Sequence, residues 1–168
     1  MKLPYVMKFS LPAVALGLVA LGLSTKPAVA ATVTTTFGVT ATVQATCLVS
    51  ATNLAFGTYT GTTTDVASTV SVTCSNTTPY NVGLSAGLAT GSTVTTRQMT
   101  GPASALLNYA LFSDASRTVN WGQTIGTDTV TGTGNGTAQA ISVFGRLSSG
   151  QFVAPGAYTD TITATVTY

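Results

Sequence analysis

Alternation with a period of two residues is the feature that most constrains the fold of this chain. Between residues 32 and 43 the odd positions are mainly apolar and the even positions are mainly threonine, and residues 158–168 repeat this arrangement. Such a period places alternate side chains on opposite faces of a β-strand. Threonine supplies about one residue in five, and its β-branched side chain favours strands over helices. The sequence therefore predicts strands, and no helical periodicity follows the apolar N-terminal segment.

Shorter strand-forming stretches follow one another between turn signals. The predicted strands and strand-like stretches cover residues 32–43, 47–49, 54–59, 66–74, 80–86, 94–99, 106–112, 118–121, 140–147 and 158–168. Turn-forming residues at 61–65, 76–79 and 132–136 separate them. Many short strands with turns between them predict an all-β protein with one antiparallel β-sandwich domain, and a barrel is the alternative.

The N-terminus has the three parts of an export signal. Lys2 and Lys8 supply positive charge, residues 9–23 are mainly apolar, and Ala28-Val29-Ala30 forms a small-x-small cleavage site. A membrane anchor is the alternative, but the apolar run is shorter than the roughly 20 residues that span a bilayer. We therefore expect a signal peptide over residues 1–30, export from the cytoplasm, and no stable membrane insertion after cleavage.

Composition excludes several classes of function. Histidine and glutamate are absent, which excludes His-based triads, His-based zinc sites and paired-glutamate acid–base chemistry. Beyond residue 30 only Arg97, Arg117 and Arg146 face four scattered aspartates, so the formal net charge is −1. Such a chain lacks the basic surface of a nucleic-acid-binding protein. No catalytic, metal or cofactor site is expected, but so sparsely charged a surface favours association.

The two cysteines, Cys47 and Cys74, are expected to form a disulfide. Thiols in an oxidising compartment pair, and neither cysteine has a CxxC partner or a neighbouring base that would favour redox chemistry. Closing a loop of this length stabilises the fold by about 3.5 kcal/mol in the loop-entropy picture.

The two end strands suggest a mode of assembly. Residues 32–43 precede the first cysteine and need not belong to the disulfide-bonded body, and residues 158–168 form a strand that reaches the last residue. A terminal strand exposes an unpaired edge unless another strand joins it. A spare strand at one end and an open edge at the other predict that each chain donates a strand to a neighbour.

Several motifs resemble those of the spore coat protein U domain family. They are Cys47, Leu54-Ala55-Phe56-Gly57-Thr58-Tyr59, Val70-Ser71-Val72-Thr73-Cys74, Pro79-Tyr80-Asn81-Val82, Leu107-Asn108-Tyr109-Ala110-Leu111-Phe112, Val143-Phe144-Gly145-Arg146-Leu147 and the ending from Gly156 to Tyr168. This family includes subunits of archaic (Csu-type) chaperone–usher pili. The resemblance implies an incomplete immunoglobulin-like sandwich over residues 45–168, which lacks its seventh strand, and a donor strand over residues 31–44.

The resemblance also implies partners and site residues. A periplasmic chaperone would supply the missing strand in transit, and an identical or related subunit would replace it at an outer-membrane usher. The product would be a surface fimbrium that serves adhesion and biofilm formation. The donor side chains would be Val33, Thr35, Phe37, Val39, Ala41 and Val43. The acceptor edge, which also binds the chaperone, would present Tyr158, Asp160, Ile162, Ala164, Val166 and Tyr168, with the C-terminal carboxylate as an anchor. Thr35 is polar at an inward position, which leaves the donor register open.

Other interpretations compete with strand donation. Residues 32–43 would fold into their own sandwich if the chain were a self-contained secreted coat or binding domain. An outer-membrane barrel would also end on an alternating strand with a terminal tyrosine. A hydrolase is remote because histidine and glutamate are lacking.

Overall fold

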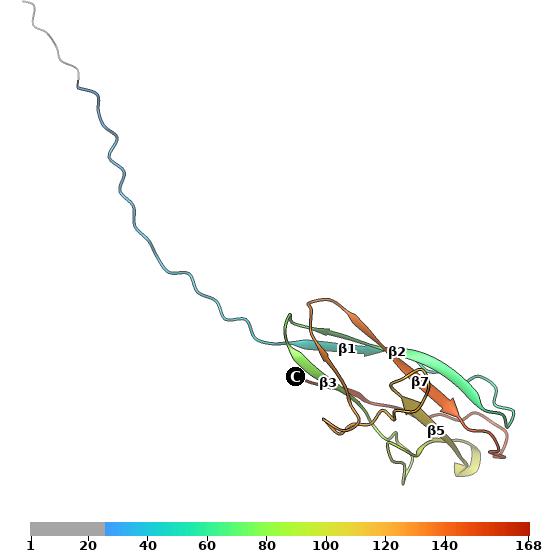
Figure 1. Ribbon diagram of the computed structural model, residues 1–168. Helices are drawn as coiled ribbons and strands as arrows, with labels where there is room; N and C mark the ends of the chain where they lie inside the picture. Colours follow the sequence, from blue (N-terminus) through green and yellow to red (C-terminus); the bar gives the residue numbers. More distant parts are fainter. Residues whose placement is uncertain (1–25) are drawn as a thin grey trace, which may run out of the picture. The chain divides into compact units, whose positions relative to one another are not determined.

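The computed structural model describes residues 26–168 (Figure 1). The predicted signal peptide lies outside the described residues except for residues 26–30, which are exposed and form no strand or helix. Two units make up the chain, Met1–Thr40 and Ala41–Tyr168. The second unit contains all the regular structure of the described residues, which consists of eight strands and one short 3-10 helix, Pro102–Ser104.

The larger sheet has five antiparallel strands in the order β1-β2-β7-β5-β4. Their bounds are Cys47–Ala51 for β1, Thr64–Cys74 for β2, Gln139–Leu147 for β7, Leu106–Phe112 for β5 and Arg97–Thr100 for β4. The long strands β2 and β7 pair with a register that opposes Asp65 to Arg146. Alternate residues of both strands, such as Val70, Val72, Val143 and Leu147, are buried, as the period-two pattern predicts.

The smaller sheet has three antiparallel strands in the order β6-β3-β8. Their bounds are Val130–Thr133 for β6, Pro79–Leu84 for β3 and Ala164–Thr167 for β8. The last strand, β8, pairs with β3 alone, so it forms one edge of this sheet. Its apolar residues Ala164 and Val166 are half-buried, whereas the threonines between them are exposed.

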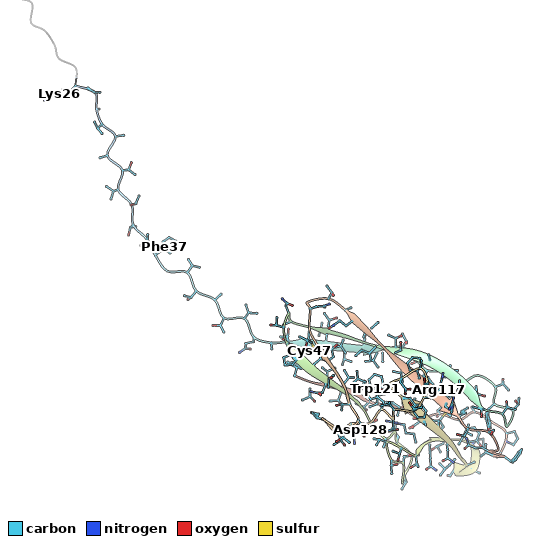
Figure 2. All side chains as sticks on the ribbon, viewed as in Figure 1. Lys26, Phe37, Cys47, Arg117, Trp121 and Asp128 are labelled. Carbon is cyan, nitrogen blue, oxygen red and sulfur yellow. A yellow bond between two sulfur atoms is a disulfide. The ribbon has the colours of Figure 1, made fainter. Side chains whose placement is uncertain are left out.

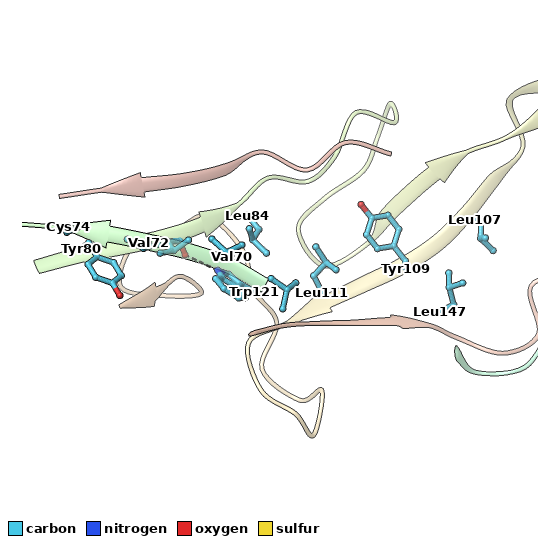
Figure 3. Close-up of a cluster of buried hydrophobic side chains, with 12 residues drawn as sticks. Val70, Val72, Cys74, Tyr80, Leu84, Leu107, Tyr109, Leu111, Trp121 and Leu147 are labelled. Carbon is cyan, nitrogen blue, oxygen red and sulfur yellow. Dashed lines mark hydrogen bonds between the residues drawn. The ribbon is translucent and has the colours of Figure 1, made fainter. Parts of the chain in front are cut away.

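Residues from both sheets form one buried cluster (Figure 3). Its members are Val70, Val72, Cys74, Tyr80, Val82, Leu84, Leu107, Tyr109, Leu111, Trp121, Val143 and Leu147. Trp121 is wholly buried, and its indole N–H donates to the carbonyl of Val82 at 2.8 Å. This arrangement confirms the all-β antiparallel sandwich that the sequence predicts.

The disulfide joins Cys47 to Cys74, as predicted. The two residues lie directly opposite each other in the β1–β2 ladder, which brings their α-carbons to 4.1 Å. Cys74 is buried and Cys47 is half-buried, so the bond ties the edge strand β1 to the core.

Several predicted strands are shorter in the structure, or absent. Residues 54–59 form no strand, and the weak strand expected from residue 94 begins only at Arg97. The segment 132–136 was expected to be a turn, but its first two residues belong to β6. Residues 158–168 pair with β3 only over β8, and residues 32–43 have no strand partner. A strand pattern specifies two faces but not a partner, and these last two segments form ladders only where one is available.

Candidate functional site

An open groove of about 1180 Å³ lies in the unit Ala41–Tyr168. Apolar side chains from both sheets line it, namely Val70, Leu84, Met99, Leu107, Leu111, Val143 and Leu147. Residues 51–61 form one wall, and residues 151–160 with Ile162 and Ala164 form the other. The groove therefore gives access to the core of the sandwich between the β1–β2 connection and the C-terminal segment.

The first wall is an irregular segment that packs through apolar side chains. Leu54 and Phe56 lie over Gly145 of β7, where an added β-carbon would come within 3.0 Å of both side chains. The ring of Phe56 meets that of Tyr109 edge-on at 6.1 Å between centroids. The hydroxyl of Tyr59 donates to the carbonyl of Ser148 at 2.6 Å, which fixes this wall to the end of β7. All three of these wall side chains remain only half-buried, because the groove is open above them.

The second wall contains most of the residues predicted as the acceptor edge. Tyr158, Asp160, Ile162 and Ala164 line the groove and are half-buried, whereas the threonines between them are exposed. Val166 packs against the core beyond the groove, and Tyr168 is 58% exposed. The structure thus brings four of the six predicted acceptor residues to one groove and leaves the last two outside its lining.

This wall passes from one sheet to the other. Thr159 forms an isolated bridge with Thr100 at the end of β4, in the larger sheet. Four residues later the carbonyl of Thr163 accepts from the backbone N–H of Ser85, and β8 then continues along β3. Asp160 lies at this crossing, where the backbone changes partners.

The Asp160 carboxylate holds the crossing together. One oxygen, Oδ1, accepts the backbone N–H groups of Leu88 and Thr161, each at 2.8 Å, and the other, Oδ2, accepts the hydroxyl of Tyr109 at 2.6 Å. Gly87 has a positive φ of 91°, and a β-carbon there would collide with this carboxylate. The pKa of Tyr109 is raised far above its usual range. Burial of the phenol is the larger cause, and its hydrogen bond to Asp160 is the second. The phenol is therefore a permanent donor to Asp160.

Arg97 is a structural residue that no motif in the sequence marks. Its side chain has no exposed surface and donates to four carbonyls, those of Leu84, Ser85, Val94 and Trp121. Burial lowers the pKa of this guanidinium from its ordinary value. The guanidinium fixes the end of β3, whose next residue, Ser85, bonds to the acceptor wall. Only its rarity in the sequence could have drawn attention to it.

The N-terminal segment, residues 32–43, was predicted as the donor strand and is exposed on both of its faces. Val33, Phe37, Val39 and Val43 are all exposed, by 94%, 85%, 84% and 89%. Figure 2 labels Phe37 on this segment. The intervening Thr35 and Ala41 are exposed too. Whether these six side chains enter the groove of another chain stays a prediction, because the structure contains one chain.

The described residues contain neither a membrane helix nor a metal cluster. Over residues 26–168, no helix is long and apolar enough to cross a bilayer. Within the same range, no three His, Cys, Asp or Glu side chains gather into a group that could hold a metal ion.

Comparison with known protein families assigns the chain to one of them. The sequence profile of the Spore Coat Protein U domain matches residues 33–165, well over half of the sequence. The chain belongs to the spore coat protein U domain family. Both walls of the groove and most of the N-terminal segment fall within the matched range.

A curated relative of this chain is Protein U of Myxococcus xanthus. The two are 40% identical over 83 residues, which cover 48% of this chain and 46% of Protein U. The similarity therefore spans about half the length of each protein.

A solved structure confirms the resemblance to archaic pili. It is the crystal structure of the CsuC–CsuE chaperone–tip adhesion subunit pre-assembly complex from archaic chaperone–usher Csu pili of Acinetobacter baumannii. The similarity has a TM-score of 0.58 and 26% sequence identity, and it covers 76% of this spore coat protein U domain chain and 41% of the matched chain.

Proposed function

We propose that this protein is an exported structural subunit of a surface fimbrium or pilus. Each subunit would accept a β-strand in the groove and donate its own residues 32–43 to the next subunit. The main supporting observation is that one chain contains both a groove that opens onto apolar core side chains, beside an edge strand, and an exposed segment with alternating apolar residues. Adhesion and biofilm formation would follow from the polymer at the cell surface.

The groove is suited to a strand because both of its walls are incomplete. Leu54, Phe56 and Ile162 stay half-buried although they pack against the core, and β8 has unpaired backbone groups on its outer side. An inserted strand would cover the apolar side chains and complete the ladder, as in other cases of β-strand addition. Burial on both sides is needed, because ordering a free segment costs conformational entropy.

The short connection between the donor segment and the domain favours donation to another copy. Only residues 44–46 separate Val43 from β1, and none of them is glycine, asparagine or proline. Thr46 is also bonded to Ser75, through its N–H at 3.0 Å and its carbonyl at 2.9 Å. Tight reversal of the chain normally needs residues that accept a positive φ, so residues 44–46 carry no turn signal that would fold the segment back onto its own domain.

The proposed partners follow from the structural comparison. The matched structure is of a chaperone with a pilus subunit, so a periplasmic chaperone would occupy the groove of this chain before another subunit does. An outer-membrane usher would then exchange the chaperone for the donor segment, after removal of a signal peptide at residues 1–30.

Gel electrophoresis in SDS tests the proposal directly. Surface extracts of cells that co-express the chain with its candidate chaperone and usher are compared before and after boiling. The intact chain should give a ladder that boiling removes, and a chain without residues 32–43 should give none. A control in which Thr34, Thr36 and Thr40 become serine changes only the outward face and should keep the ladder.

A single unboiled band from the intact chain, at the mobility of a monomer, would overturn the proposal. That result would favour the alternative of a self-contained secreted coat or binding domain.

A further inference from the structure

One polar residue interrupts each of the two apolar faces that strand donation would bring together. On the donor side, Thr35 stands among Val33, Phe37 and Val39. On the acceptor side, Asp160 stands between Tyr158 and Ile162 and lines the groove. The domain thus offers one carboxylate among the residues that line the groove, and the donor offers one hydroxyl on an otherwise apolar face.

Of the two carboxylate oxygens of Asp160, Oδ2 accepts fewer hydrogen bonds than Oδ1. An ionised carboxylate can accept about four hydrogen bonds, two on each oxygen. Both positions of Oδ1 are used by the N–H groups of Leu88 and Thr161, whereas Oδ2 accepts only the hydroxyl of Tyr109. Oδ2 therefore accepts one hydrogen bond fewer than Oδ1, with the α-carbon of Gly87 packed against it, on a residue that is half-buried in the groove wall.

An inserted strand would remove both groups from water. A buried hydroxyl or carboxylate position without a partner is costly, whereas a hydrogen bond to a charged group is among the stronger ones in proteins. We infer that the hydroxyl of Thr35 in one copy donates to Oδ2 of Asp160 in the next copy, and that this contact sets the register of the donor strand. This inference rests on the proposed function, because it needs the donor strand to enter the groove.

The contact penalises the alternative registers. Because strand side chains repeat every two residues, a slipped donor keeps its apolar face inward only if it moves by two. Such a shift would place the hydroxyl of Thr35 beside Ile162 or the Tyr158 ring and would place an apolar side chain against Asp160. Both changes leave a polar group buried without its partner.

The test is a double-mutant cycle on the full chain in the same co-expression system. The four chains are wild type, Thr35→Val, Asp160→Asn and the double variant, and the readout is the rate at which the ladder dissociates in SDS at a fixed temperature. Thr35→Val keeps the β-branched shape and removes only the hydroxyl. We expect it to speed dissociation by roughly tenfold, the factor that corresponds to about 1.4 kcal/mol, although it makes the donor more apolar.

Two further variants separate this contact from general packing. Thr35→Ser keeps the hydroxyl and should dissociate at nearly the wild-type rate. Thr36→Val is the same substitution on the outward face and should also leave the rate close to that of the wild type. In the Asp160→Asn background, the effect of Thr35→Val should shrink to no more than about twofold.

Each failure has its own meaning. If Thr35→Val dissociates no faster than Thr36→Val, or if its effect is undiminished with Asp160→Asn, the inferred contact is wrong and strand donation stands. If the wild-type chain gives no ladder, the proposed function fails and this contact fails with it. Should Asp160→Asn not fold, the three variants at Thr35 and Thr36 still decide the question.

Discussion

Residues 32–43 and residues 158–168 have nearly the same sequence pattern but opposite surroundings. In both segments apolar residues alternate with threonines. In the C-terminal segment the apolar face packs against the core and the threonines are exposed, whereas in the N-terminal segment both faces are exposed. The difference shows that alternation specifies which face of a strand can be buried, whereas the rest of the molecule determines whether other residues pack against that face.

The two segments should therefore respond differently to the same kind of change. A change in the N-terminal segment should alter assembly without altering the stability of the single chain. A change in the C-terminal segment should alter both. The measurements needed are the SDS ladder for assembly and the thermal unfolding of the unassembled chain for stability.

The largest effect is expected from a charge on the inward face of the donor. Phe37→Asp would place a carboxylate without a partner in the apolar groove, which costs several kcal/mol, so the ladder should disappear. The unfolding temperature of the unassembled chain should not change, because Phe37 is exposed there. Thr36→Asp is the matched control on the outward face and should keep the ladder. A ladder that survives Phe37→Asp would show that this face does not enter the groove.

The next largest effect is expected at Arg97, which fixes the end of β3 beside the acceptor wall. Arg97→Met keeps the approximate volume of the side chain but leaves four carbonyls, two of them in buried and two in part-buried hydrogen bonds, without their charged donor. We expect a loss of about 3 kcal/mol or more in the free energy of unfolding, measured by thermal or denaturant unfolding of the single chain. Arg146→Met removes an arginine from an exposed pair instead and should cost much less. Equal effects of the two variants would contradict a structural role for Arg97.

A pair of truncations compares the two segments directly. Ile162 packs half-buried against the core, so Ile162→Ala should lower the free energy of unfolding of the single chain by about 2 kcal/mol and also weaken the ladder. Val39→Ala should weaken the ladder and leave the single chain unchanged. Unfolding and SDS dissociation of both variants provide the comparison. If Val39→Ala destabilises the single chain, the donor segment already packs on the domain without a partner.

The sequence allowed the sheets to be predicted because their signals are local. The positions of β2, β3, β5 and β7 follow from alternation and turn residues, and the Cys47–Cys74 bond follows from compartment and count. Residues 158–168 were predicted as one continuous strand. The neighbouring sequence gives no signal that Asp160 bonds to Leu88 and Tyr109, which are distant along the chain. The carboxylate of Asp160 accepts the backbone N–H groups of Leu88 and Thr161, which in a continuous ladder would donate to a neighbouring strand.

Two other features lay beyond prediction for the same reason. The groove wall over residues 51–61 was predicted in part as a strand, but Leu54 and Phe56 settle on Gly145 of a distant strand instead. The burial of Arg97 depends on carbonyls from three separate parts of the chain, which meet only in the folded domain. Contacts between residues far apart in sequence decided these features, and a period-two pattern contains no information about them.

The smallest effect distinguishes residues 32–43 from the folded domain by their response to acid. Residues 32–43 contain no titratable side chain, whereas the domain contains Asp65, whose hydrogen bond from Arg146 holds the carboxyl pKa below its ordinary value of 3.8. A carboxylate with a lowered pKa in the folded state stabilises the fold above its unfolded pKa, and this contribution is lost as the pH falls through the folded value. Asp65→Asn should therefore lower the unfolding temperature slightly at pH 7, and the difference should vanish well below pH 3.8. Unfolding curves across this range test the sign, and a difference that persists in acid would show that the ion pair is not its cause.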